Sequence, residues 1–330
     1  MCHHRYQLNP LPRGGGFRCR THEAITCSLG DANMQKPADM LYSYFSECSE
    51  ISTDFVGVEV ETSFVNTNGT AISVATSQAI FQTLTEVGWN VVERTGTLVT
   101  KLQNAKGDIL LYELGRQNIE LSTAPQRSSS LVSRTQDLLK EIYVSAEVHN
   151  AMPCFEPILM TDEDLLVIPD ERDATWLEID GRESLRPLAT TSAVQFTFDT
   201  TPTKAIGLIN QLGRQAEEFL VDYPQDRVWR EYIRSSKAGY RSDRYGGPLL
   251  FSSLRDYCNK LTMHEVVNGD RLTSAREMKS FSIPLFLRSV WWHFRLRRYG
   301  DRLCVEVRPL ARNTDERLRV QLDTVLKIMS

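Results

Sequence analysis

The sequence lacks any apolar run that approaches the length of a membrane span. Its longest such run, IPLFL at 283–287, is far shorter than the roughly 20 residues that a spanning helix needs. The first 30 residues also lack the apolar core of a signal peptide. We therefore expect a cytoplasmic protein that does not bind membranes.

A strong net charge is absent as well. The 38 Lys and Arg residues nearly balance the 42 Asp and Glu residues, which gives a net charge of −4. Proteins that bind nucleic acid usually carry a basic field, so we expect no nucleic-acid partner. The aromatic run at 291–294 beside Arg295, Arg297 and Arg298 is compatible with base stacking. A packed helix with a basic, solvated end is the favoured interpretation of that segment.

The cysteines do not form a disulfide framework. There are seven, an odd number, without a repeating interval, which is typical of reduced thiols. The N-terminal group lacks the paired spacing of a zinc site, and a loose terminus is favoured over metal binding: Cys2, His3, His4, Cys19, His22 and Cys27. We expect residues 1–35 to form a flexible arm and residues 36–330 to form a single domain.

Catalytic nucleophile motifs are missing too. No G-x-S-x-G sequence accompanies His149, His264 or His293, so we expect these histidines to be structural or exposed. Apolar spacing and start signals predict helices at 38–48, 72–88, 128–149, 202–221, 282–296 and 314–328. A hairpin is predicted from 97–103 and 108–114 around Gly107. Residues 150–187 and 225–262 are expected to be mostly loop with short elements.

Four segments read as strands that are apolar on one face and polar on the other: 55–65, 119–123, 193–199 and 303–308. Side chains alternate along a strand, so each polar set points one way. Alternation of this kind favours an antiparallel sheet with one face covered. We therefore predict an α+β fold with a curved, mostly antiparallel sheet, helices packed on its apolar face and an open polar face.

Carboxylates dominate the predicted polar face. Glu59 and Glu61 stand two residues apart, about 6–7 Å along one strand, and Glu120 and Glu306 recur in the same context. Carboxylates that meet away from water raise one another's pKa, and Mg²⁺, which takes oxygen ligands and bridges to phosphates, relieves the repulsion. A lone E-x-E is more often a solvated strand face. The recurrence of the pattern makes this face a candidate site.

Four segments in this order carry a resemblance to a known family, with a looser likeness in RVWREYIRSSKAGYR (227–241): GVEVE (57–61), YELGRQNIELSTAP (112–125), TTSAVQFTFD (190–199) and VEVRPLARNTD (305–315). Together they resemble the motif series of the glutamate–cysteine ligase family, which includes plant enzymes and bacterial carboxylate–amine ligases. The likeness covers about 57–325. It implies a catalytic sheet similar to that of glutamine synthetase.

The resemblance also implies roles for single residues and a requirement for ATP and Mg²⁺. Metal ligands would be Glu59, Glu61, Glu120 and Glu306, with Glu113 as a further acid. Glu59 and Arg308 would be catalytic, Arg308 would meet a phosphate or a substrate carboxylate, and Gln195 would face the nucleotide or the metal. The spacing in YELGRQNIE is one residue longer than in the plant-type motif, which leaves the place of Glu113 open.

Two further cations are candidates for binding ATP phosphates. Lys101 lies on the predicted hairpin, where a plain surface lysine is the alternative. Arg241 belongs to a basic run over 227–245, where a solvated charged surface is the alternative. No P-loop sequence is present to locate the nucleotide.

The sequence thus predicts an ATP- and Mg²⁺-dependent ligase that joins a carboxylate to an amine through an acyl phosphate. Glutamate and cysteine are the first choice of substrates. Another acid and amine, or a short peptide from a specialised-metabolite pathway, is the alternative, and a non-catalytic relative that binds a nucleotide or a partner is the rival. The expected partners are small molecules, and the oligomeric state is left open.

Overall fold

The computed structural model describes residues 36–330 except 238–243, 264, 269–270, 275–281 and 289. The predicted arm, its cysteine–histidine group, Arg241 and His264 lie outside these residues. Among the described helices, none combines the length and the apolar character that a membrane crossing requires. The single domain predicted for 36–330 stays a prediction.

A ten-stranded sheet forms the centre of the molecule, and all of its strand pairs are antiparallel. Its main path runs β13 (Phe294–Tyr299), β14 (Arg302–Ala311), β8 (Ala193–Thr200), β1 (Phe55–Asn66), β5 (Asn118–Ser122), β4 (Ile109–Tyr112), β3 (Leu98–Gln103) and β2 (Asn90–Thr95). The short strands β6 (Gln126–Arg127) and β7 (Ala151–Cys154) also pair with β1. Two small separate sheets join β10 (Glu265–Asn268) to β11 (Arg271–Ser274) and β9 (Tyr245–Gly246) to β12 (Trp291–Trp292). The predicted α+β class and antiparallel sheet are confirmed.

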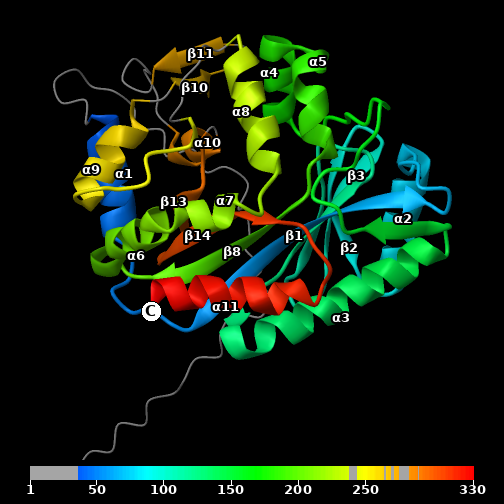
Figure 1. Cartoon of the computed structure of the whole chain (residues 1–330), viewed down its shortest axis with the longest axis horizontal. Helices are drawn as coiled ribbons and strands as arrows, with labels where there is room; N and C mark the ends of the chain where they lie inside the picture. Colours follow the sequence, from blue (N-terminus) through cyan, green and yellow to red (C-terminus); the bar gives the residue numbers. More distant parts are fainter. Residues whose placement is uncertain (1–35, 238–243, 264, 269–270, 275–281, 289) are drawn as a thin grey trace, which may run out of the picture.

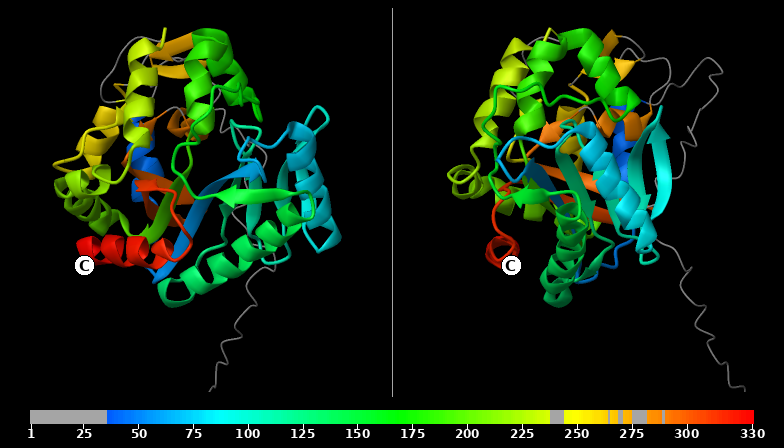
Figure 2. Two further views of the ribbon diagram at one scale, coloured as in Figure 1. Left: turned by 45° about the vertical axis from the view of Figure 1, so that its right-hand side comes forward. Right: turned by 90° about the vertical axis from the view of Figure 1, so that its right-hand side faces the viewer.

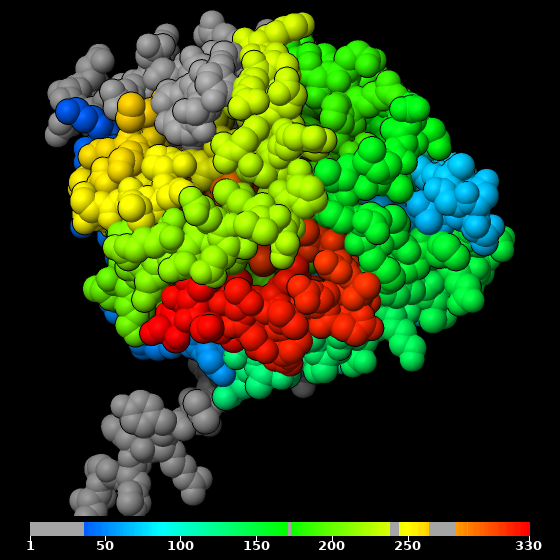
Figure 3. Space-filling view, viewed as in Figure 1, coloured from blue at the N-terminus to red at the C-terminus, as the bar shows by residue number. Residues whose placement is uncertain are grey.

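The apolar face of the sheet packs against helices and forms the main core. Val58, Val60 and Phe196 are buried there with Leu139 and Leu322 from two of the covering helices. These helices are α1 (Pro37–Ser46), α2 (Val74–Glu86), α3 (Ser128–Glu147), α6 (Pro202–Arg214), α7 (Ala216–Leu220), α9 (Leu254–Leu261) and α11 (Arg317–Met329). The removal of this apolar surface from water is the main force that holds the layers together. On the outside, α11 lies against α6 (Figure 3).

A second hydrophobic cluster lies apart from the main core. It contains Trp176, Tyr232 and Trp291, and it joins α4 (Glu171–Asp180), α5 (Arg182–Leu185), the 3-10 helix η1 (Arg186–Thr190), α8 (Gln225–Ser235) and the β9–β12 pair. We call this unit the cap. The helices α4, α5 and α8 stand together across the sheet from α3 and α11 (Figures 1 and 2).

The prediction that 150–187 is mostly loop is wrong for its second half, which contains α4, α5 and the start of η1. Asp170 caps α4 by accepting a hydrogen bond from the backbone N–H of Asp173 at 2.9 Å. Near the end of α4, Asp180 accepts hydrogen bonds from the Tyr232 hydroxyl at 2.8 Å and from the Lys237 backbone N–H at 2.7 Å. Acidic residues were the reason for predicting a loop here. In the structure one of them, Asp170, caps a helix, and another, Asp180, is a buried link to α8.

The helix predicted at 282–296 is also wrong. Among the described residues of this segment, only α10 (Ile283–Leu287) is helical, and β12 and β13 follow it. Phe294 and Leu296 face the main core while Arg295 pairs with Glu306 on β14. This period of two belongs to a strand. The aromatic run at 291–294 is accordingly buried strand, not a helix with a solvated end.

A buried arginine fastens the end of β14 to β1 and α3. The Arg312 side chain is fully buried, donates to Thr62 Oγ1 at 3.1 Å and to the Tyr143 hydroxyl at 2.7 Å, and pairs with Asp315 at 2.7 Å. Its guanidinium also lies over the Phe155 ring, 5.0 Å from the centroid. One cation therefore satisfies polar groups from several parts of the chain.

We predict that Arg312→Met lowers the free energy of unfolding by about 3 kcal/mol, because the substitution leaves buried polar groups without their cation. The matched control is Arg319→Met on α11, whose exposed pair with Asp323 spans 3.9 Å and contributes less than about 1 kcal/mol. Urea denaturation of both variants measures the difference. Equal losses in the two variants would contradict the structural role of Arg312.

Candidate functional site

The polar side chains of the sheet form rows that run across the strands. In one row Lys101 stands opposite Leu111, Leu111 opposite Glu120, and Glu120 opposite Glu61. In the next, Glu59 stands opposite Gln195. In a third, Thr197 stands opposite Glu306, and Glu306 opposite Arg295. Strand register thus brings four of the predicted acids onto one face of the sheet: Glu59, Glu61, Glu120 and Glu306.

Glu59, Glu61 and Glu120 are carboxylates without a matching number of cations. Glu120 is buried, and Glu59 and Glu61 are partly buried. Within the described residues, neither Glu59 nor Glu120 makes a hydrogen bond or an ion pair. Burial raises the pKa of Glu59, and the charge of Glu306 raises it further. Burial raises the pKa of Glu120 well above its usual range, and nearby Glu59 and Glu113 add to the effect.

Glu61 is held by the strand beside it. It accepts hydrogen bonds from the Ala193 backbone N–H at 2.9 Å and from Gln195 Nε2 at 3.1 Å. Burial nevertheless raises the pKa of Glu61 to about 7, against the opposing effects of the Ala193 hydrogen bond and Arg308. The hydrogen bonds from Ala193 and Gln195 orient this carboxylate but do not neutralise its charge.

Glu306 is the exception among the acids. Arg295 Nε donates to its Oε2, and Arg308 Nη1 lies 3.4 Å from the same oxygen. Burial acts to raise the pKa of Glu306, but the two guanidinium groups outweigh it and hold the pKa well below its usual range. Arg308 also donates to Gln195 Oε1. The β13–β14 end of the face therefore carries its own positive charge.

A cavity of about 60 Å³ opens at the edge of this face, where the sheet meets the cap. The sheet and the loop before β5 contribute Glu61, Glu113 and Arg308, and the cap side contributes the rings of Trp229, Tyr245 and Trp291. Trp229 and Tyr245 are stacked with ring centroids 5.7 Å apart. Because ligand pockets usually measure about 300–1,000 Å³, this cavity fits one end of a substrate. The predicted open polar face is thus covered at this edge.

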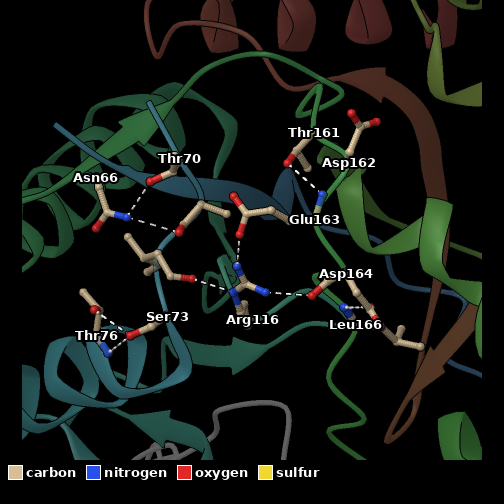
Figure 4. A network of polar contacts seen from close by, with 12 residues as sticks. Asn66, Thr70, Ser73, Thr76, Arg116, Thr161, Asp162, Glu163, Asp164 and Leu166 are labelled. Carbon is tan, nitrogen blue, oxygen red and sulfur yellow. Dashed lines mark hydrogen bonds and ion pairs between the residues drawn. The ribbon is translucent and has the colours of Figure 1, made fainter. Parts of the chain in front are cut away.

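The loop at 114–117, which contributes Leu114 and Gly115 to the cavity wall, is held by Arg116 to the segment at 163–164 (Figure 4). Arg116 donates to the carbonyl oxygens of Ile72 at 2.9 Å and Asp164 at 2.7 Å, and it pairs with Glu163. The Cβ of any other residue at Gly115 would lie 2.4 Å from the Ala189 carbonyl oxygen. Only glycine permits this approach of the loop to η1.

The structure brings most of the predicted site residues together. Glu59, Glu61, Glu120, Gln195, Glu306 and Arg308 share the polar face, Glu113 lines the cavity, and Lys101 lies two strands beyond Glu120. The sequence did not reveal the cavity or the inclusion of His293 in its lining. An isolated histidine carries no motif; only the alternation of 291–296 as a strand would have placed it beside the site.

The donor chemistry of this face fits Mg²⁺. The acids offer hard oxygen ligands, and a divalent cation would relieve the repulsion that raises their pKa values. In the part of the chain that the structure describes, no three acid, histidine or cysteine side chains already surround one point. Mg²⁺ usually takes one or two protein carboxylates and completes its shell with water and phosphate oxygens. The ligand roles of Glu59, Glu61, Glu113, Glu120 and Glu306 stay predictions.

Comparison with protein-family models gives no match, and no curated protein sequence matches the chain. Among solved structures it is similar to a bifunctional glutathione synthetase from Pasteurella multocida, with 11% identity and a TM-score of 0.43 over 83% of this chain and 39% of that one. Glutamate–cysteine ligase from Francisella tularensis in complex with AMP gives 10% identity and a TM-score of 0.45 over 85% and 68%.

Ligand-free GmaS gives 11% identity and a TM-score of 0.39 over 89% of this chain and 58% of that one. The chain therefore spans about two fifths of the glutathione synthetase and less than two thirds of GmaS. With TM-scores this low, we base the proposals below on the site itself.

The raised pKa of Glu61 predicts a pH-dependent stability. A carboxyl whose pKa is higher in the folded state binds its proton more tightly there, so the ligand-free protein loses stability as pH rises from about 4.5 through about 7. Glu61→Gln imitates the protonated form and should remove this loss. At pH 8 and without divalent cations, we expect the variant to be more stable than the wild type by on the order of 1–3 kcal/mol.

Urea denaturation at pH 5 and pH 8 in the presence of a chelator measures the effect. The control is Glu93→Gln on the exposed strand β2, which should follow the wild type at both pH values. Identical stability of the Glu61→Gln variant and the wild type at pH 8 would contradict a repulsive, desolvated carboxylate at this position.

Proposed function

We propose that this protein is an ATP-dependent ligase that joins a carboxylate to an amine. The observation that supports this most directly is the group of Glu59, Glu61 and Glu120, three carboxylates in two adjacent rows of one partly buried face with too few cations of their own. A face of this kind is suited to a divalent cation with the phosphates of a nucleotide. The order of motifs that resembles glutamate–cysteine ligases supports the same conclusion independently.

Residues at different places on the sheet would have different roles in this reaction. Glu59, Glu61 and Glu120, with Glu306 and Glu113 at the margins, would hold Mg²⁺, which when bound neutralises phosphate charge and aligns the phosphate groups. Arg308, fixed by Gln195 and Glu306, is placed to stabilise the phosphoryl group as it moves to the substrate carboxylate. Lys101 extends the row of Glu61 and Glu120 and is the further candidate for ATP phosphates.

The proposed reaction has two steps. A substrate carboxylate oxygen attacks the terminal phosphorus of ATP, which releases ADP and forms an acyl phosphate. An amine then attacks the acyl carbon, the C–N bond forms, and phosphate leaves with the electrons of the C–O bond. Glutamate and cysteine are the first pair to test, and another acid, amine or short peptide is the alternative.

We predict that purified protein releases phosphate from ATP only when Mg²⁺, an acid and an amine are all present. Glu59→Gln should lower the rate at least about 100-fold, because the loss of one preorganised charge in such a site costs that much, while the melting temperature does not fall below that of the wild type. Phosphate release across a panel of acid and amine pairs, led by glutamate and cysteine, provides the measurement. The matched control is Glu86→Gln at the exposed end of α2, which should retain the wild-type rate.

Binding of Mg-ATP separates the ligase from a non-catalytic relative. A ligand that binds only the folded state raises its melting temperature. Stabilisation by Mg-ATP without turnover for any pair would favour a binding protein or a larger, peptidic substrate. Turnover by Glu59→Gln at the wild-type rate, or the absence of both turnover and stabilisation in the wild type, would contradict the proposal.

A further inference from the structure

His293 is a buried histidine that lines the cavity between the sheet and the cap. It lies between β12 and β13, and only 3% of it is exposed. Its Nε2 lies 3.3 Å from Oδ1 of Asp226 on α8, and the other oxygen of Asp226 accepts a hydrogen bond from Arg230 Nε at 2.6 Å. Asp226 therefore stands between a cation and the imidazole, with one oxygen directed at each.

This arrangement selects one form of the imidazole. Nε2 and Oδ1 of Asp226 are both buried, and neither makes a hydrogen bond within the described residues. A proton on Nε2, directed at Oδ1, is the form of the ring that relieves both atoms, and it leaves the lone pair on Nδ1. Within the described residues, Nδ1 has no hydrogen-bond partner. Burial lowers the pKa of His293, although Asp226 opposes the effect, so the ring is neutral near pH 7 and able to accept a proton.

The charged and titratable groups around His293 come from every element packed against it. Asp226 and Arg230 come from α8, Arg308 from β14, Tyr223 from the turn before α8, and Tyr245 from β9. Glu61 contributes a carboxylate to the same cavity. The two arginines act against protonation of the ring and Asp226 acts in favour of it.

Two buried side-chain amides line the cavity. In each, the N–H group donates a hydrogen bond and the oxygen accepts none from a described residue. Asn118 Nδ2 donates to the Thr191 carbonyl oxygen at 2.9 Å, and Gln225 Nε2 donates to the Ser192 carbonyl oxygen at 2.6 Å. Because carbonyl oxygens only accept, these bonds determine which way each amide faces. Asn118 Oδ1 and Gln225 Oε1 are then buried acceptors without a partner in the described part of the chain.

Buried acceptors of this kind require a donor. The nearby carboxylates of Glu61 and Glu113 and the rings of Trp229, Tyr245 and Trp291 add attraction for a positive charge. A protonated primary amine carries three N–H donors and one positive charge, which matches this lining. Its small head group also matches the cavity volume.

We propose that this cavity binds the protonated amine substrate and that His293, oriented by Asp226, removes its proton. The inference rests on the proposed ligase function. An ammonium group has no lone pair and cannot attack an acyl phosphate, so one proton must first leave the nitrogen. His293 Nδ1 takes that proton, and the neutral amine attacks the acyl carbon. As the C–O bond breaks, the departing phosphate takes the second proton from the nitrogen, and His293 returns its proton to water.

Hydroxylamine provides the test, because it is largely unprotonated at neutral pH and needs no base. We predict that His293→Gln lowers kcat with the amine substrate by at least about 100-fold, the usual contribution of a general base. With hydroxylamine as the nucleophile, the same variant should stay within about threefold of the wild type. The rate of the wild type should also rise with pH through one ionisation that the variant lacks.

His149→Gln is the matched control, because this histidine contacts Thr83 at 2.8 Å on the α2–α3 side of the molecule and does not line the cavity. It should leave both rates unchanged. Asp226→Asn should lower the amine rate and spare the hydroxylamine rate, and it supplies the test if His293→Gln does not fold.

Three outcomes would overturn the inference. Equal loss with amine and with hydroxylamine would assign His293 a purely structural role. An unchanged amine rate in His293→Gln would exclude it as the base. A wild type without turnover for either nucleophile would remove the ligase function on which the inference depends, and this result differs from the first two because it is seen before any substitution is made.

Discussion

The repulsion between carboxylates on β1 and β5 is the constraint that the rest of the site depends on. Strand register places Glu61 directly opposite Glu120, and Glu59 lies one row away. The alternation of the strands does not allow these side chains to turn away, because their neighbours on the other face form the main core. A folded chain that keeps such charges together is suited to a ligand that supplies positive charge.

Charge is also distributed unevenly along the polar face, with the cations at one end and, among the described residues, the unpaired acids at the other. At the β13–β14 end, Arg295 and Arg308 neutralise Glu306, and the pKa of that acid falls. At the β1–β5 end the pKa values of the acids rise. Chemically similar carboxylates therefore serve different purposes. Glu306 is already paired with guanidinium groups, and Glu59 and Glu120 have no such pair among the described residues.

The acids of the site were predictable from sequence because a strand has a period of two, and four segments repeated it, three of them with Glu on the polar side and one with Gln195 and Asp199. The cap was not predictable in the same way. Its hydrophobic cluster joins Trp176, Tyr232 and Trp291, which are far apart in the chain and share no local period. His293 was missed for a related reason: the aromatic run was interpreted as a helix, and only its pairing near β14 places the ring beside Arg308.

The separation into a sheet and a cap assigns chemistry and selectivity to different parts of the chain. In the proposed ligase the acids and arginines of the sheet would act on phosphate, whatever acid or amine is joined. The cavity takes its aromatic wall and Gln225 from the cap side, and Asp226 of the same helix α8 lies beside His293 of the lining. In the proposed ligase, a change of amine substrate would therefore involve substitutions in α8 and β9 above all, while Glu61 of β1 and Asn118 of β5 supply the sheet's part of the same lining. Because Gly115 brings the loop before β5 against η1 of the cap, this close contact sets the distance between the cap and the sheet, and substitutions in α8 and β9 would change the wall of the cavity while the contact is kept.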